Sequence, residues 1–214
     1  GSVAGRQPKP VPRGPPLRYL GPPENTSAYQ IQGQMAGDNY RAGARVLARK
    51  GLSLDIWLYS PQLPELADLA KAVPGVTIVL NHIGGLLRVG PYANRDDEVL
   101  ANWRSGIAAV AECPNVNVKL GGIGMPIIGF DWHARTVPIG SEELAESLAP
   151  LVNYCIEKFG PSRCMFESNF PVDKVAYSHH VLYNAFKRLS KGYSATERAG
   201  LFHDNATRVY RVNV

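Results

Sequence analysis

Two stretches of this chain decide its fold: VTIVLNHIGG at residues 76–85 and RCMFESNF at residues 163–170. Each is a short apolar, partly β-branched run that ends in polar residues, which is typical of a parallel strand covered on both faces. Two other runs have the same character, LSLDIWLY at residues 52–59 and VNVKLGG at residues 116–122. We therefore predict four parallel strands, near residues 52–59, 76–82, 116–120 and 163–168.

Apolar residues at helical spacing occupy the segments between these runs. The clearest helix begins near Ser141, which is expected to cap it, and ends at Gly160-Pro161. Ser194 and Glu197 have the spacing of a capping box. Regular alternation of strand and helix predicts a parallel sheet with right-handed crossovers, as a doubly wound sheet or as a barrel. The chain lacks both glycine-rich nucleotide-binding motifs, which favours the barrel. A full (β/α)₈ barrel takes roughly 250 residues, so four strands predict half of one.

Composition divides the chain into two regions. We predict an extended, proline-rich basic arm over residues 1–27 and a globular domain over residues 28–214. Four of the 23 Lys and Arg residues stand in the first 23 positions without any acidic residue, so the rest of the chain is nearly neutral. A basic arm could contact a polyanion, but a solvated segment accounts for this composition without a nucleic-acid partner.

Membrane and secretory signals are missing from the sequence. No run approaches the roughly 18 consecutive apolar residues of a membrane-spanning helix, and no signal peptide is recognisable. The three cysteines are odd in number and without C-x-x-C spacing, which predicts reduced core thiols rather than a zinc or disulfide framework. We expect a cytoplasmic protein.

Polar residues follow the predicted strands, where the site of a barrel would lie. His82 ends an apolar run before Gly84-Gly85 and could act as a general base or bind a metal, or it could simply bond a backbone carbonyl. Glu167 and Asn169 are two residues apart, so on a strand both would point to one face. They could accept a proton and orient water, or they could satisfy a buried polar layer.

Other polar residues near the strand ends are weaker candidates. His133, in the loop sequence GFDWHART, could close over a ligand or be a surface histidine. The pair Asp173-Lys174 has the composition of a solvated loop. His179, His180 and His203 fall on predicted helices, and we do not assign them a catalytic role.

Four motifs together resemble a known family. WLYSPQLPELADLA, TIVLNHIGG, NVKLGGIGMP and CMFESNFPVDK are similar, in this order and spacing, to the C-terminal strands of the amidohydrolase-related family of TIM-barrel metal-dependent hydrolases. The branch that includes dicarboxylate and sugar lactonases is the most similar. The resemblance covers residues 38–212 and implies a partial (β/α)₈ TIM barrel, built from the strands of the second half of the barrel.

The functional positions of the family carry over one at a time. The H-x-H pair that ends the first strand of the family does not occur in this chain. The histidine of the family's fifth strand stands in a Y-H-P-Q context, and this chain has YSPQ with Ser60 there. The histidine of the sixth strand matches His82, and the aspartate of the eighth corresponds to Asn169. A catalytic zinc site needs about three protein ligands, so we expect no metal or other cofactor unless upstream sequence or a partner supplies ligands.

The resemblance implies a hydrolase that opens a cyclic ester or amide by attack of water on the carbonyl carbon. His82 would be the acid and base, and Lys119, Glu167 and Asn169 would complete the catalytic group. Tyr59, Ser60 and His133 would contact the small-molecule carbonyl substrate, and activity would be weak or absent in this chain alone. The alternative is a non-catalytic half-barrel that acts through self-association or a partner protein, which the missing strands and the changes at two ligand positions favour. In either case we expect a homo-oligomer without membrane or nucleic-acid partners.

Overall fold

Four parallel strands form one sheet in the computed structural model, which describes residues 32–212. The predicted arm at residues 1–27 and the boundary after it lie outside these residues. The strands are β1 (Ser53–Ile56), β2 (Thr77–Leu80), β3 (Val116–Leu120) and β4 (Cys164–Phe166), and they pair in the order β1-β2-β3-β4. The four predicted strands and their common direction are confirmed. A doubly wound sheet reverses its strand order, so the sequential order excludes that alternative.

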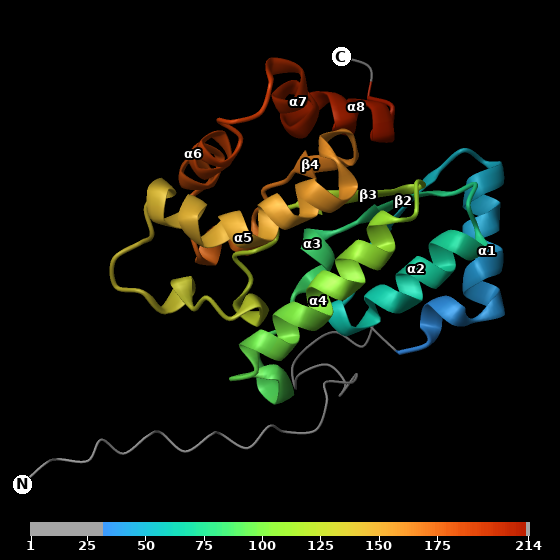
Figure 1. Ribbon diagram of the computed structural model, residues 1–214, viewed down its shortest axis with the longest axis horizontal. Helices are drawn as coiled ribbons and strands as arrows, with labels where there is room; N and C mark the ends of the chain where they lie inside the picture. The colour runs from blue at the N-terminus through green and yellow to red at the C-terminus, as the bar shows by residue number, and fades with distance from the viewer. Residues whose placement is uncertain (1–31, 213–214) are drawn as a thin grey trace, which may run out of the picture.

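Within the described residues one α-helix precedes β1, and the other α-helices follow the strands in chain order. They are α1 (Asp38–Arg49), α2 (Leu63–Ala72), the single turn α3 (His82–Gly85), α4 (Asp96–Ala111), α5 (Ser141–Phe159), α6 (His179–Leu189), α7 (Ala195–Ala199) and α8 (Asn205–Tyr210). Figure 1 shows α2, α4 and α5 beside one another along the strands, and α2 packs on α4, α4 on α5 and α5 on α6. Helices that cover neighbouring strands in sequence order are the wall of a (β/α) barrel.

The two faces of the sheet differ in chemistry because side chains alternate along each strand. Ile78, Leu80 and Val118 face the helices and belong to the main hydrophobic core. The opposite face carries Asp55, Val79, Asn117, Lys119 and Met165, which the strand register places next to one another. This polar face corresponds to the inside of a barrel.

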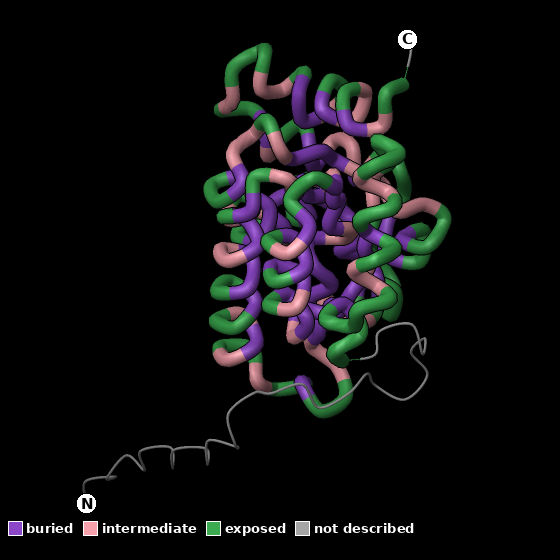
Figure 2. The backbone as a smooth tube through the Cα atoms, turned by 90° about the vertical axis from the view of Figure 1, so that its right-hand side faces the viewer, coloured by how far each residue is buried: buried purple, intermediate pink, exposed green. Residues whose placement is uncertain are grey.

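Burial follows helical periodicity. Figure 2 shows buried and exposed segments alternating along the helices, with the buried segments turned toward the interior of the molecule. In α4 the buried positions include Val99, Trp103, Ile107 and Val110, which repeat every three or four residues. Among the described residues no helix combines the length and apolar character needed to cross a membrane.

Three strands end earlier than predicted, and one of them is β2, which ends at Leu80 and leaves Asn81 and His82 outside the sheet. β1 ends at Ile56, so Trp57, Leu58 and Tyr59 leave the sheet before the short helix η2 (Ser60–Gln62). β4 ends at Phe166, which pairs with Leu120 at the end of β3. The glycines that follow Leu120 take no part in the pairing, so Glu167 begins a loop. The prediction that Glu167 and Asn169 share a strand face is therefore wrong, because neither lies on the strand.

The helix ends show one confirmed and one incorrect cap. Ser194 and Glu197 form the predicted capping box at the start of α7. Ser141 is the first residue of α5 rather than its cap, because Gly140 has the extended conformation of the N-cap position. The four-residue turn α3 contains left-handed residues, and His82 itself has φ 55°.

Candidate active site

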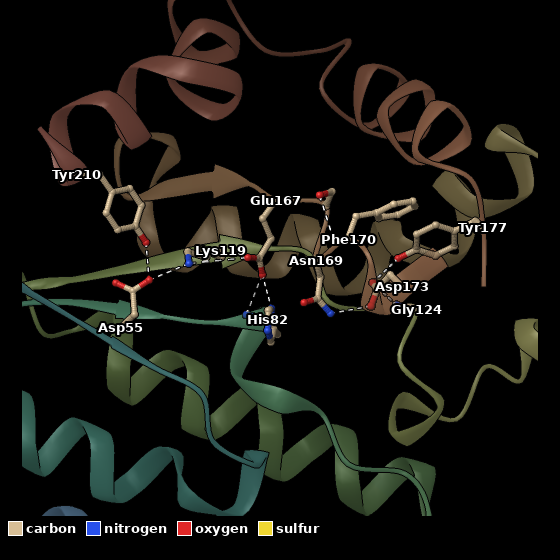
Figure 3. A network of polar contacts seen from close by, with 11 residues as sticks. Asp55, His82, Lys119, Gly124, Glu167, Asn169, Phe170, Asp173, Tyr177 and Tyr210 are labelled. Atoms are coloured by element: carbon tan, nitrogen blue, oxygen red, sulfur yellow. Dashed lines mark hydrogen bonds and ion pairs between the residues drawn. The ribbon is translucent and has the colours of Figure 1, made fainter. Parts of the chain in front are cut away.

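His82 and Glu167 form the centre of a polar cluster at the C-terminal ends of the strands (Figure 3). The Nδ1 atom of His82 lies 2.5 Å from Oε1 of Glu167, and the backbone N–H of His82 donates to the same oxygen over 3.2 Å. Both side chains are 16% exposed, so solvent reaches them only in part. Because the carboxylate accepts, Nδ1 carries the proton and Nε2 is left as the basic nitrogen.

A pair of glycines permits this close contact. A Cβ atom on Gly122 would lie 2.4 Å from Cγ of His82, and one on Gly121 would lie 2.4 Å from Cγ of Glu167. Both distances are far below van der Waals contact, so any larger residue would separate the pair. The strand-end sequence Lys119-Leu120-Gly121-Gly122 therefore sets the geometry of the site, a role that the sequence pattern did not reveal.

Lys119 connects Glu167 to a second charged group. Its Nζ atom lies 2.8 Å from Oδ2 of Asp55 on β1 and 4.0 Å from Oε2 of Glu167. The Tyr210 hydroxyl of α8 donates to Oδ2 of Asp55 over 2.6 Å. Burial, and then the neighbouring Asp55, raise the pKa of Tyr210, which keeps this donor protonated. Asp55 and Tyr210 were not predicted, although an aspartate inside an otherwise apolar strand was a usable signal.

Asn169 belongs to a neighbouring buried cluster. Its Nδ2 donates to Oδ1 of Asp173 over 2.7 Å, and the other carboxylate oxygen accepts from the Gly124 backbone N–H and the Tyr177 hydroxyl, over 2.9 and 2.8 Å. Asp173 is fully buried. The prediction that Asp173-Lys174 is a solvated loop pair is therefore wrong for Asp173, which the turn directs inward toward three donors.

The three predicted substrate-binding residues lie in different surroundings. Tyr59 is fully buried, with its ring against Trp57, and the Trp57 ring packs in turn against His82 at 6.4 Å between centroids. Ser60 is buried at the start of η2. His133 is exposed on the short helix η5 (Trp132–Ala134) in the loop after β3. The Trp57 ring thus lies between Tyr59 and His82, whereas His133 lies on the surface.

The donor set does not fit a zinc ion held by this part of the chain alone. Within residues 32–212 no group of three or more His, Cys, Asp or Glu side chains is arranged to bind a metal. His82 uses Nδ1 for Glu167, and Ser60 and Asn169 offer hydroxyl and amide oxygens, which are poor zinc ligands. These residues by themselves therefore do not make a zinc centre.

Comparison with known proteins agrees with this architecture. The model of a family described as amidohydrolase matches residues 12–212. An uncharacterized protein of Sinorhizobium fredii, y4mH, is 40% identical over 173 residues, 81% of this chain and 52% of the relative. The L-fucono-1,5-lactonase of Burkholderia multivorans is 27% identical over 173 residues, 80% of this chain and 55% of the relative. The chain thus spans about half the length of the curated relatives it matches.

Solved structures show the same partial coverage. A crystal structure of an amidohydrolase from Burkholderia multivorans with bound HEPES superposes with a TM-score of 0.72 at 25% identity, over 85% of this chain and 60% of that chain. An amidohydrolase 2 from Bifidobacterium longum subsp. infantis gives 0.58 at 25% identity, over 85% and 59%. The four parallel strands with their helices are thus a part of the TIM barrel of such structures. From its motifs, its sheet order and the family match, the chain belongs to the amidohydrolase family.

Proposed function

We propose that the chain carries the acid–base pair of a hydrolase that opens a cyclic ester or a cyclic amide. The observation that carries this proposal is the contact of 2.5 Å between Nδ1 of His82 and Oε1 of Glu167. A carboxylate on one imidazole nitrogen fixes the tautomer and makes the other nitrogen a stronger base. The similarity to a sugar lactonase favours a lactone as the substrate.

The reaction follows from this arrangement. Nε2 of His82 takes a proton from water while the water oxygen forms a bond to the carbonyl carbon, and the carbonyl electrons move to its oxygen. When the tetrahedral intermediate collapses, the ring C–O or C–N bond breaks, and the imidazolium returns the proton to the leaving atom. Glu167 stabilises the imidazolium between these steps. Lys119 lies 4.0 Å from the second oxygen of Glu167, where its positive charge attracts that carboxylate.

The other residues predicted from the sequence have roles in the same proposal. Asn169 would contact the water or the substrate, and Tyr59, Ser60 and His133 would shape the substrate side of the site. Cys113, Cys155 and Cys164 are free and buried, which agrees with a reducing compartment and hence a cytoplasmic location.

Kinetics with sugar 1,5-lactones test this proposal. We expect slow hydrolysis above the uncatalysed rate, since the chain spans only part of its relatives, and we expect His82→Gln to lower kcat by about 100-fold or more. The control is His203→Gln, because His203 is exposed on the π-helical turn Gly200–Asp204, where it pairs with Asp204. Equal rates for wild type and His82→Gln would contradict the proposal.

A second function rests on a different observation. Within residues 32–212, β1 and β4 each pair with a strand on one side only. Edge strands of a parallel sheet are pairing surfaces, so a non-catalytic half-barrel that binds a second copy or a partner protein is the alternative. A chain that folds cooperatively, associates and shows no lactone hydrolysis dependent on His82 would favour it.

A further inference from the structure

Asp173 lies next to the proposed site but takes no part in the proton transfer. It stands in the short helix η7 (Val172–Val175), four residues after Asn169. Its side chain is 0% exposed, whereas Val172 and Val175 on the same turn are 52% and 58% exposed. Valine is usually buried and aspartate usually exposed, so this turn has the opposite pattern. Burial of a carboxylate costs free energy unless hydrogen bonds compensate it, which directs attention to the donors around Asp173.

The carboxylate joins three segments through three donors. Gly124 belongs to the loop after β3, Tyr177 to the segment before α6, and Asn169 to the loop after β4. A Cβ atom on Gly124 would lie 2.9 Å from Cζ of Tyr177, so the backbone reaches the carboxylate only because this residue is glycine. Burial raises the pKa of Tyr177, and its hydroxyl remains a donor.

These bonds fix which end of the Asn169 amide faces His82. The NH₂ group donates to Oδ1 of Asp173, so the nitrogen points to Asp173 and the oxygen points away from it. Figure 3 shows the amide oxygen on the side of His82 and the nitrogen on the side of Asp173. Asn169 has φ 53°, a left-handed conformation that asparagine tolerates, which turns its side chain toward both groups.

We propose that Asp173 is a positioning residue, which orients the Asn169 amide so that its oxygen accepts a hydrogen bond from the attacking water. This inference rests on the proposed function. Water has two hydrogens, and Nε2 of His82 and Oδ1 of Asn169 are two acceptors for them. When both acceptors hold the water, one of its lone pairs points at the carbonyl carbon. The water then loses its rotational freedom on binding rather than in the transition state, which lowers the activation barrier.

Two NMR measurements test the orientation without any substrate. With ¹⁵N-labelled asparagine, the Asn169 NH₂ group should show one downfield proton that exchanges slowly with solvent, and Asp173→Asn should abolish this signal. Asn102 is the reference, since its Nδ2 donates to the Glu98 carbonyl on the exposed side of α4. An Asn169 amide that exchanges as fast as that of Asn102 would overturn the proposal.

The second measurement uses Asn169→Asp, which keeps Asp173 with Gly124 and Tyr177 and is independent of whether Asp173→Asn folds. A carboxylate in place of the Asn169 amide would stand against Asp173, and two such groups at hydrogen-bond distance share one proton. We expect ¹³C carboxyl titration to show one carboxyl whose pKa lies above that of Asp173 in the wild type. A highest carboxyl pKa no higher than that of wild-type Asp173 would mean that the side chains do not face one another.

Kinetics with a sugar 1,5-lactone then test the catalytic consequence. Asp173→Asn should lower kcat on the order of 10-fold or more with little change in KM, because water rather than substrate is misplaced. Asn169→Asp combined with Asp173→Asn should recover most of the lost kcat, since the exchanged pair again presents an oxygen to His82. A double variant no faster than Asp173→Asn would contradict the positioning role. Intact NMR signals in a wild-type chain without hydrolysis would refute the proposed function but not the orientation.

Discussion

At the scale of single residues, the glycine pair after β3 controls the distance between His82 and Glu167. Gly122 has φ 66°, and a methyl group there would meet the His82 ring at 2.4 Å. We predict that Gly122→Ala lowers the free energy of unfolding by about 1–3 kcal/mol, through backbone strain and overpacking. Urea denaturation measures this change.

The matched control for that variant is Gly43→Ala. Gly43 is exposed within α1, and a Cβ atom there would have no neighbour within 4 Å. Alanine is the better helix former by about 0.5–1 kcal/mol, so this substitution should stabilise the chain. Equal destabilisation by both substitutions would show that the His82 contact is not the cause.

Asp173 predicts a particular dependence of stability on pH. Burial raises the pKa of this carboxyl above its ordinary value, and its three hydrogen bonds oppose the rise only in part. The folded state therefore holds the proton more tightly than the unfolded state. The resulting stabilisation is complete below the ordinary pKa of aspartate, about 3.9, and is lost as the pH rises through the folded pKa.

Urea denaturation of the wild type and of Asp173→Asn at several pH values from 4 to 8 measures how much the Asp173 carboxyl contributes to the free energy of unfolding. The difference in unfolding free energy should favour the wild type most at the acid end of the range and fall as the pH rises. A difference that grows with pH would mean that the hydrogen bonds outweigh burial and that the pKa is lowered.

His82 could be predicted from the sequence and Asp173 could not, for a physical reason. His82 stands two residues after a buried apolar run, so the local pattern alone places it just beyond the end of a strand. Asp173 depends on Gly124 and Tyr177, and the contact with Gly124 spans 49 positions of the chain. Its local sequence, Pro171-Val172-Asp173-Lys174, has only the composition of a turn.

At the scale of elements, one asparagine attaches α8 to the sheet. Nδ2 of Asn205 donates to the carbonyls of Pro161 and Cys164, over 2.8 and 2.7 Å, and so fixes the start of α8 beside the beginning of β4. Val209 of the same helix packs on Val79 and Met165, on the polar face of the sheet. The helix also carries Tyr210, which bonds Asp55.

We predict that Asn205→Ala lowers the free energy of unfolding by about 2 kcal/mol, because two buried carbonyls lose their donor. Asn102→Ala is the control, since it removes a single exposed bond within α4 and should change stability by less than about 0.5 kcal/mol. Thermal or urea denaturation compares the two. Similar small effects would show that α8 is held by Val209 and Tyr210 instead.

The elements themselves were largely predictable, but their ends were less so. Each predicted strand is present. A run of β-branched and apolar residues is typical of a parallel strand that is covered on both faces, so the local sequence alone indicates it. The extensions over 57–59, 81–82 and 167–168 were wrong, because those residues leave the sheet for packing and polar contacts with other segments. Local pattern does not contain that information.

At the scale of the whole molecule, the sheet within residues 32–212 has two edges and one polar face. Lys119 and Glu167 on that side keep 19% and 16% of their side-chain surface exposed. In a closed barrel this face is interior, and the strands at both edges are paired. The half-barrel architecture, which the sequence length and strand count predicted, thus leaves pairing surfaces on the described part of the chain.

The interior face of the sheet is already covered within the chain, since Val79, Asn117 and Met165 are buried and Val209 of α8 packs on Val79 and Met165. We predict that the 214-residue chain self-associates at micromolar concentration, most simply as a two-fold dimer that pairs the open edges of the sheet. Sedimentation velocity measures the state directly. The control is the same measurement at increasing dilution, where a specific dimer dissociates to a folded or unfolding monomer. A cooperatively folded monomer at all concentrations would contradict the prediction.

In the proposed site, Glu167 holds the proton on Nδ1 of His82 and leaves Nε2 as the base, and every other catalytic role depends on this tautomer. Histidine ¹⁵N NMR tests it most directly, because the chemical shifts of the two ring nitrogens identify the tautomer. We predict that the neutral His82 ring is protonated on Nδ1 with a downfield proton, and that Glu167→Gln removes this preference. Neutral His82 protonated on Nε2 in the wild type would contradict the proposed mechanism.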